Sequence, residues 1–150
     1  MNPLPTAYRI ILAGILILFL GSLYLMTVTS DQWVRLNSLT IDNAQVGQDP
    51  AVHYSRTFLR PFVADWAVAI YVLEQGEWTA YRSCHGYWPD YKPGTPNPNK
   101  TLSWLVGGDE KCWRFPRGIY RVTVTLIINP KSILSRSASV SSPAFEVGGV

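Results

Sequence analysis

The sequence predicts an all-β domain, an antiparallel β-sandwich, preceded by one transmembrane helix at the N-terminus. Residues 10–28 are uncharged and almost entirely apolar, whereas the rest of the chain alternates apolar and polar residues in short runs. A hydrophobic fraction of 47% with only 15% charged residues excludes a disordered chain, because enough apolar surface can be buried to offset the lost chain entropy. The 150 residues therefore suit a membrane anchor and one domain.

The apolar segment 10–28 is long enough to cross a bilayer. As a helix it would extend roughly 28 Å, close to the thickness of the hydrocarbon core. Arg9 precedes the segment and Asp31 is the first charge after it. The positive-inside rule therefore predicts a short cytoplasmic N-terminus over residues 1–9 and an exported domain over residues 29–150. The alternative is cleavage as a signal peptide, which would release a secreted domain, although the run exceeds the roughly 7–15 apolar residues of such segments.

Candidate strands follow one another at intervals of about ten residues, as in an antiparallel sandwich. Gln75-Gly76 predicts a hairpin turn. Residues 85–100 hold four prolines and two glycines, and we expect a long loop there because proline removes a donor from the hydrogen-bond ladder. The predicted strands are residues 34–41, 52–58, 66–72, 78–83, 102–106, 118–128, 138–140 and 144–147.

Two features resemble known groups of proteins. Trp66 on an early strand and Gly118-x-Tyr120 at the start of a late strand resemble immunoglobulin-like and fibronectin-like domains, in which such a tyrosine pins a corner. This resemblance implies an Ig-like sandwich, although the two cysteines do not match the usual pair across its core. The segments VGQDPAVHYSRTF and PRGIYRV resemble uncharacterised membrane-anchored proteins of Gram-negative bacteria and their phages. That resemblance implies a source and an architecture but no catalytic residue.

The two cysteines, Cys84 and Cys112, predict one disulfide, because an exported domain folds in an oxidising compartment. The alternative is Cys84 as a nucleophile with His85 as its base. We disfavour it because neighbouring side chains on a strand point to opposite faces. His53 and His85 are the only histidines, with no carboxylate at ligand spacing, so the sequence predicts no metal, cofactor or catalytic group.

Aromatic residues of the expected loop and cations after the second cysteine are candidates for contact with a partner. The aromatic residues form either a small core under the loop or a rigid surface for a protein or a glycan. The cations form either a solvated face or a positive patch for anionic lipid, lipopolysaccharide or a cell-wall polymer. The possible contact surface comprises Tyr87, Trp88, Tyr91, Lys111, Arg114 and Arg117.

These features predict a non-enzymatic, single-pass inner-membrane protein with a periplasmic interaction domain. Its expected partners are the lipid bilayer and either an envelope or phage protein or cell-wall glycan. Nucleic acid is not an expected partner, because the exported part, with 12 basic and 10 acidic residues, has a net charge of only +2 and lies outside the cytoplasm. The alternative functions are an envelope enzyme acting on glycan, with its site in the aromatic loop, and a secreted domain.

Overall fold

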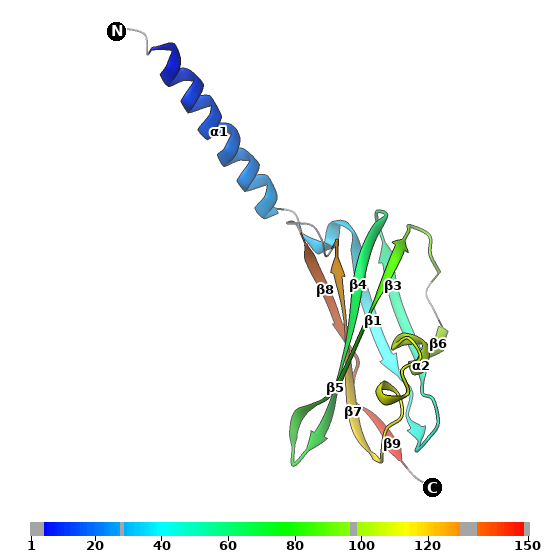
Figure 1. Cartoon of the computed structure of the whole chain (residues 1–150). Helices are drawn as coiled ribbons and strands as arrows, with labels where there is room; N and C mark the ends of the chain where they lie inside the picture. Colours follow the sequence, from blue (N-terminus) through cyan, green and yellow to red (C-terminus); the bar gives the residue numbers. More distant parts are fainter. Residues whose placement is uncertain (1–4, 28, 97–98, 130–134, 149–150) are drawn as a thin grey trace.

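The computed structural model consists of a long N-terminal helix that projects from one end of a β domain (Figure 1). It describes residues 5–27, 29–96, 99–129 and 135–148. The elements are α1 (Thr6–Thr27), η1 (Ser30–Gln32), β1 (Val34–Ile41), β2 (Ala44–Gln45), β3 (Ala51–Phe58), β4 (Phe62–Glu74), β5 (Glu77–Tyr91), β6 (Asn99–Thr101), α2 (Leu102–Leu105), η2 (Glu110–Cys112), β7 (Gly118–Ile128), β8 (Arg136–Ser141) and β9 (Phe145–Gly148).

Helix α1 is long and apolar enough to cross a membrane. Its 19-residue window Thr6–Tyr24 has a mean hydropathy of 2.0, and none of that window is buried against the protein. Pro5 lies just before the helix, where its missing N–H costs no helical bond. The helix starts four residues earlier than the predicted segment 10–28, and Val28 lies outside the described residues.

The β domain contains two sheets. One sheet has the order β1-β3-β6, and the other has the order β2-β9-β7-β4-β5 with β8 also paired to β7. The short pair β2–β9 is parallel, and the remaining pairs are antiparallel. Strands β9 and β8 pair with successive stretches of the same edge of β7, Gly118–Tyr120 and Thr123–Ile128.

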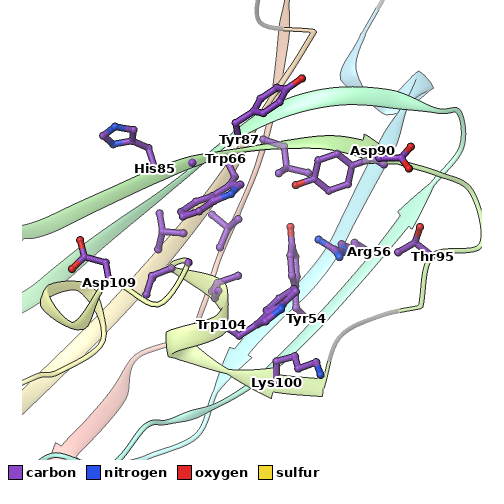
Figure 2. Close-up of a pocket in the computed structure, with 18 of the residues that line it drawn as sticks. Tyr54, Arg56, Trp66, His85, Tyr87, Asp90, Thr95, Lys100, Trp104 and Asp109 are labelled. Carbon is purple, nitrogen blue, oxygen red and sulfur yellow. The ribbon is translucent and has the colours of Figure 1, made fainter.

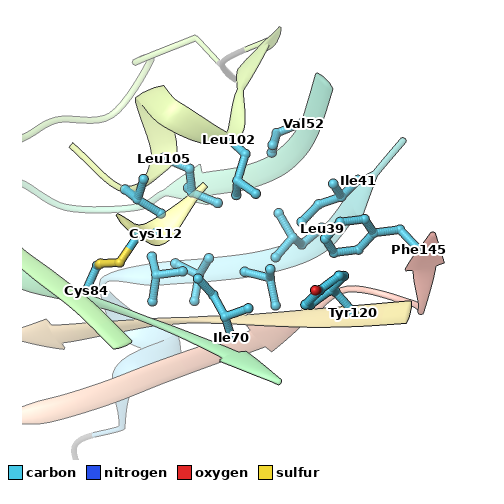
Figure 3. Close-up of a cluster of buried hydrophobic side chains, with 14 of the residues drawn as sticks. Leu39, Ile41, Val52, Ile70, Cys84, Leu102, Leu105, Cys112, Tyr120 and Phe145 are labelled. Atoms are coloured by element: carbon cyan, nitrogen blue, oxygen red, sulfur yellow. A yellow bond between two sulfur atoms is a disulfide. The ribbon is translucent and has the colours of Figure 1, made fainter. Parts of the chain in front are cut away.

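The main hydrophobic core lies between the two sheets (Figure 3). Alternate residues of β7 point inward, which is the period-two pattern of a strand with one covered face. The β1-β3-β6 sheet supplies Leu39, Ile41 and Val52 to this core, and the larger sheet supplies Ile70 and Tyr120. A second cluster, around Phe58, Phe62, Tyr91 and Ile128, occupies the end of the domain nearer α1.

The prediction of a loop over residues 85–100 is wrong at both ends, because β5 covers its first residues and β6 begins at Asn99. Strand β5 continues as far as Tyr91, seven residues into that segment. Pro89 is tolerated because, among the described strands, β5 is the last of its sheet and pairs only with β4, so the missing N–H breaks no pairing on a second side. The register with β4 also shifts there, since Tyr91 pairs with Phe62 whereas Trp88 pairs with Ala64. A bulge accommodates the extra residue.

The predicted strand over residues 102–106 is a short helix, α2. Leu102, Leu105 and Val106 are all buried, and their spacing of i, i+3 and i+4 places them on one helical face. Trp104 lies between them in the sequence and points away, with 41% of its surface exposed. Other predictions are confirmed: β1 spans residues 34–41, and the Gln75-Gly76 turn has positive φ at both residues, 52° and 88°.

Candidate functional site

A cleft of about 830 Å³ opens between β3, the β4–β5 pair and α2 (Figure 2). Its size lies within the roughly 300–1,000 Å³ of pockets that hold small molecules. The rim carries polar side chains from β5, β6 and the adjoining loops: His85, Asp90, Thr95, Lys100 and Asp109. The floor is apolar and consists of Val68, Leu105, Val106, Val124 and Leu126.

Trp66 forms one wall of the cleft. It lies on the inner face of β4, and its indole ring packs against Gly86 of β5 and Gly107 after α2. A Cβ atom at Gly86 would overlap the ring, and one at Gly107 would lie only 3.2 Å from it. The two glycines therefore provide the space that this ring occupies.

Arg56 lies on the wall formed by β3. Its guanidinium carbon is 5.1 Å from the ring centre of Tyr54, 4.8 Å from that of Phe58 and 5.8 Å from that of Tyr91. These distances are within the range of cation–π contacts. The inward-facing positions of β3 alternate along the strand, and Arg56 occupies one of them between two buried aromatic residues. A cation is thus held at an aromatic wall of the cleft.

Tyr54 brings a hydroxyl group to the same wall. Figure 2 shows it directed into the space beside Arg56. The residue is buried, and among the described residues its hydroxyl has no hydrogen-bond partner. Burial raises the pKa of Tyr54 to about 12 against the opposing effect of the nearby Arg56 charge, and burial also raises the pKa of Tyr91. Both hydroxyls are therefore protonated at neutral pH.

The carboxylates of the rim have partners of their own. Asp90 Oδ2 lies 2.7 Å from Lys92 Nζ. Asp109 Oδ1 accepts a hydrogen bond of 3.0 Å from the backbone N–H of Lys111 and so caps η2. These contacts assign both carboxylates to local structure at the edge of the cleft.

The aromatic residues of the predicted contact surface have different positions. Tyr87 is 56% exposed and lies on the rim of the cleft. Tyr91 is only 6% exposed and stacks on Phe62, so of the two alternatives for this residue it takes the buried one. The physical reason is the continuation of β5, which turns Tyr91 toward the core. Trp88 belongs to β5 by its backbone, and its side chain lies outside the described part of the chain.

The cations of the predicted contact surface do not line the cleft. Lys111 belongs to η2 and accepts, through its backbone carbonyl, a hydrogen bond from the Arg82 guanidinium. Arg114 pairs with Glu110 at 3.1 Å and lies over the ring of Trp113. Arg117 is exposed just before β7. The structure therefore separates these cations from the aromatic part of the prediction.

The predicted disulfide between Cys84 and Cys112 is present, with Cα atoms 6.4 Å apart. It joins β5 to η2 and so holds the segment that carries α2 against the edge of the larger sheet. Asp109 lies beside the two sulfur atoms. Because these sulfurs are bonded to each other, they are not available as thiolate ligands. Of the two histidines, His53 pairs with Asp42 at 3.2 Å on the exposed surface, and His85 lies on the rim of the cleft.

Three important cleft residues were not selected by the sequence prediction. Arg56 carries the clearest signal, because a cation alternates there with apolar residues on one face of a strand. Trp66 was considered only as a feature of the Ig-like resemblance, and nothing in the local pattern indicates that a cleft opens beside it or beside Trp104. The chain matches no protein-family model, no curated protein and no solved structure. The function is therefore inferred from the cleft, the helix and the disulfide.

Proposed function

We propose that this protein is a single-pass membrane protein that presents its β domain outside the cytoplasm as a non-enzymatic binding module. The observation that carries the proposal is the cleft of about 830 Å³ in a domain tethered to an exposed apolar helix. The cleft is the proposed ligand site. The resemblance of the sequence to envelope proteins of Gram-negative bacteria and their phages supports an inner-membrane location and a periplasmic domain.

Two independent features support export of the domain. Arg9 lies before the apolar core of α1 and Asp31 follows the helix, which is the charge order that keeps an N-terminus in the cytoplasm. The Cys84–Cys112 disulfide is stable in an oxidising compartment and is rare in the cytosol.

The contacts of Tyr120 at the start of β7 support the proposal that the β domain is an Ig-like sandwich. The Tyr120 hydroxyl donates a hydrogen bond of 3.0 Å to the carbonyl of Pro116, four residues earlier. A Cβ atom at Gly118 would lie 3.1 Å from the Tyr120 ring, which explains the glycine in the Gly-x-Tyr sequence. This geometry is that of the tyrosine corner found in Ig-like domains.

Binding is favoured over hydrolysis because both carboxylates of the cleft rim are engaged locally, Asp90 with Lys92 and Asp109 with the N–H of Lys111. The competing function, an envelope enzyme acting on glycan, predicts product release from solubilised peptidoglycan fragments by the purified full chain. We expect no product during prolonged incubation. Turnover that is lost when Asp90 and Asp109 are changed to asparagine would contradict the proposal.

The topology is tested by fusing a reporter that is active only outside the cytoplasm after Val150. We expect an active reporter, and a protein that stays in the membrane fraction after carbonate washing, because α1 remains attached. Release of a soluble protein that begins at Asp31 would show instead that the helix is a cleaved signal.

A further inference from the structure

We propose that the cleft binds a small amphipathic carboxylate, with its anionic group at Arg56 and Tyr54 and its apolar body between Trp66 and the floor. This inference rests on the proposed function and names the class of ligand that the cleft takes. The surrounding side chains provide the argument.

The cation is placed for recognition of a planar anion. A guanidinium carries five N–H donors in a rigid fork that matches a carboxylate with two parallel hydrogen bonds. The rings of Tyr54, Phe58 and Tyr91 contact the guanidinium and so restrict its orientation. Arg56 therefore presents a positive charge and a planar fork in a fixed orientation at the wall of the cleft.

The Tyr54 hydroxyl is a second donor at the same place. The residue is 3% exposed, and its hydroxyl has no hydrogen-bond partner among the described residues. A buried hydroxyl without a partner costs free energy, and an anionic ligand oxygen would accept its proton. The hydroxyl is protonated at neutral pH, so it meets an anion as a donor and not as a competing charge.

The rest of the cleft suits an apolar body. Val68, Val124 and Leu126 form the floor, and the Trp66 ring forms a wall. Asp90 pairs with Lys92 and Asp109 accepts the N–H of Lys111 at the exposed rim, whereas Arg56 faces the cleft from a core-facing position of β3. A ligand with an acid group and a short aliphatic or aromatic body therefore fits this distribution of charge and apolar surface.

The test compares three compounds that share one body and differ in the head group: 3-phenylpropionate, 3-phenylpropan-1-ol and 3-phenylpropylamine. The full chain is held in lipid nanodiscs, and binding is followed through the indole N–H signals of Trp66 and Trp104 in NMR spectra. We expect the acid to bind at least tenfold more tightly than the alcohol and the amine. Equal or tighter binding of the alcohol or the amine would overturn the inference while leaving the cleft as a binding site.

Variants at Arg56 test the assigned contact. Arg56→Gln should weaken binding of the acid at least tenfold and leave the alcohol unaffected, and Arg56→Lys should weaken the acid less, because it keeps the charge and loses the fork. Arg35→Gln, at an exposed position of β1, is the matched control.

Unchanged affinity of the acid in Arg56→Gln would overturn the assignment of Arg56 as the residue that binds the carboxylate. If none of the three compounds moves either indole signal, the inference of an amphipathic carboxylate ligand is overturned. Where Arg56→Gln does not fold, the head-group series in the unaltered chain decides the inference.

Discussion

Arg56 occupies a core-facing position of β3 where neighbouring inward positions hold Tyr54 and Phe58. Placing a guanidinium there costs desolvation free energy that an apolar side chain would avoid. Contacts with the surrounding rings offset part of this cost, as expected for a cation over aromatic faces. A position that is unfavourable for packing yet faces a cleft is typical of a residue kept for binding.

Gly86 is a second residue on which the cleft depends, because the Trp66 ring occupies the place where a Cβ atom would lie. Gly86→Ala should displace this ring and lower the free energy of unfolding by about 1–3 kcal/mol, the usual cost of overpacking. Urea unfolding measures the stability, and a change in tryptophan emission reports the displaced ring.

Gly148→Ala is the control for this substitution. Gly148 also lies in a strand, β9, and an added Cβ atom would meet its nearest neighbour at an ordinary contact distance of 3.7 Å. Its stability should change by less than about 0.5 kcal/mol, as for most surface substitutions. Equal losses in the two alanine variants would show that the close approach of Gly86 to Trp66 is not the cause.

The burial of Tyr54 predicts a loss of stability at alkaline pH. Its pKa is raised from 10.0 to about 12 in the folded protein. Below pH 10 both states are protonated. Between pH 10 and 12 the unfolded tyrosine loses its proton first, so the free energy of unfolding falls by on the order of 2–3 kcal/mol. Urea unfolding at several pH values should show this decline, and Tyr54→Phe should reduce its slope. An identical slope in Tyr54→Phe would contradict this origin of the decline.

At the scale of the elements, sequence patterns predicted the strands that have one covered face. β7 follows regular alternation, whereas the alternation of β1 shifts by one residue between Leu36 and Ser38. The observed bounds of both strands, Val34–Ile41 and Gly118–Ile128, equal the predicted ones. The end of β5 was missed because prolines indicate loops unless the strand lies at a sheet edge, and the strand order is a property of the tertiary fold. α2 was missed because four residues are too few to display a helical period.

The cleft itself could not be predicted from the local sequence pattern either. It depends on where α2 and β5 lie relative to β3, and the local pattern contains no information about that placement. The sequence did show Arg56 alternating with apolar residues. It left open whether Tyr87 and Tyr91 are buried or exposed, and the continuation of β5, which was not foreseen, exposes the first and buries the second.

The disulfide stabilises the segment that closes one side of the cleft. Cys84 and Cys112 are 28 residues apart in sequence. Cys84→Ser should lower the free energy of unfolding by about 3–4 kcal/mol, because a crosslink of this span restricts the unfolded chain. Thermal unfolding of the full chain measures the change. The unaltered protein under reducing conditions is the matched comparison and should unfold at a similarly reduced temperature. An unchanged melting temperature in both would contradict a stabilising role.

At the scale of the whole molecule, the strand directions show which end of the β domain lies near α1 and which lies far from it. The backbone N–H of Leu59 donates to Trp33, a few residues after α1, so the β3–β4 connection lies at the same end as the helix (Figure 1). β7 begins at the opposite end, since its last residue Ile128 pairs with Ala64 near that connection. Its eleven residues span roughly 35 Å.

The most direct test of the central claim, that the cleft is the binding site of a membrane-anchored module, is methyl NMR of the full chain in nanodiscs during a fragment screen. The methyl groups of Val68, Val124 and Leu126 report on the floor of the cleft, and those of Val147 report on β9 outside it. We expect bound fragments to shift the floor signals in a saturable way and to leave Val147 unchanged. A diverse library that moves none of the floor signals, or that moves Val147 equally, would contradict the claim.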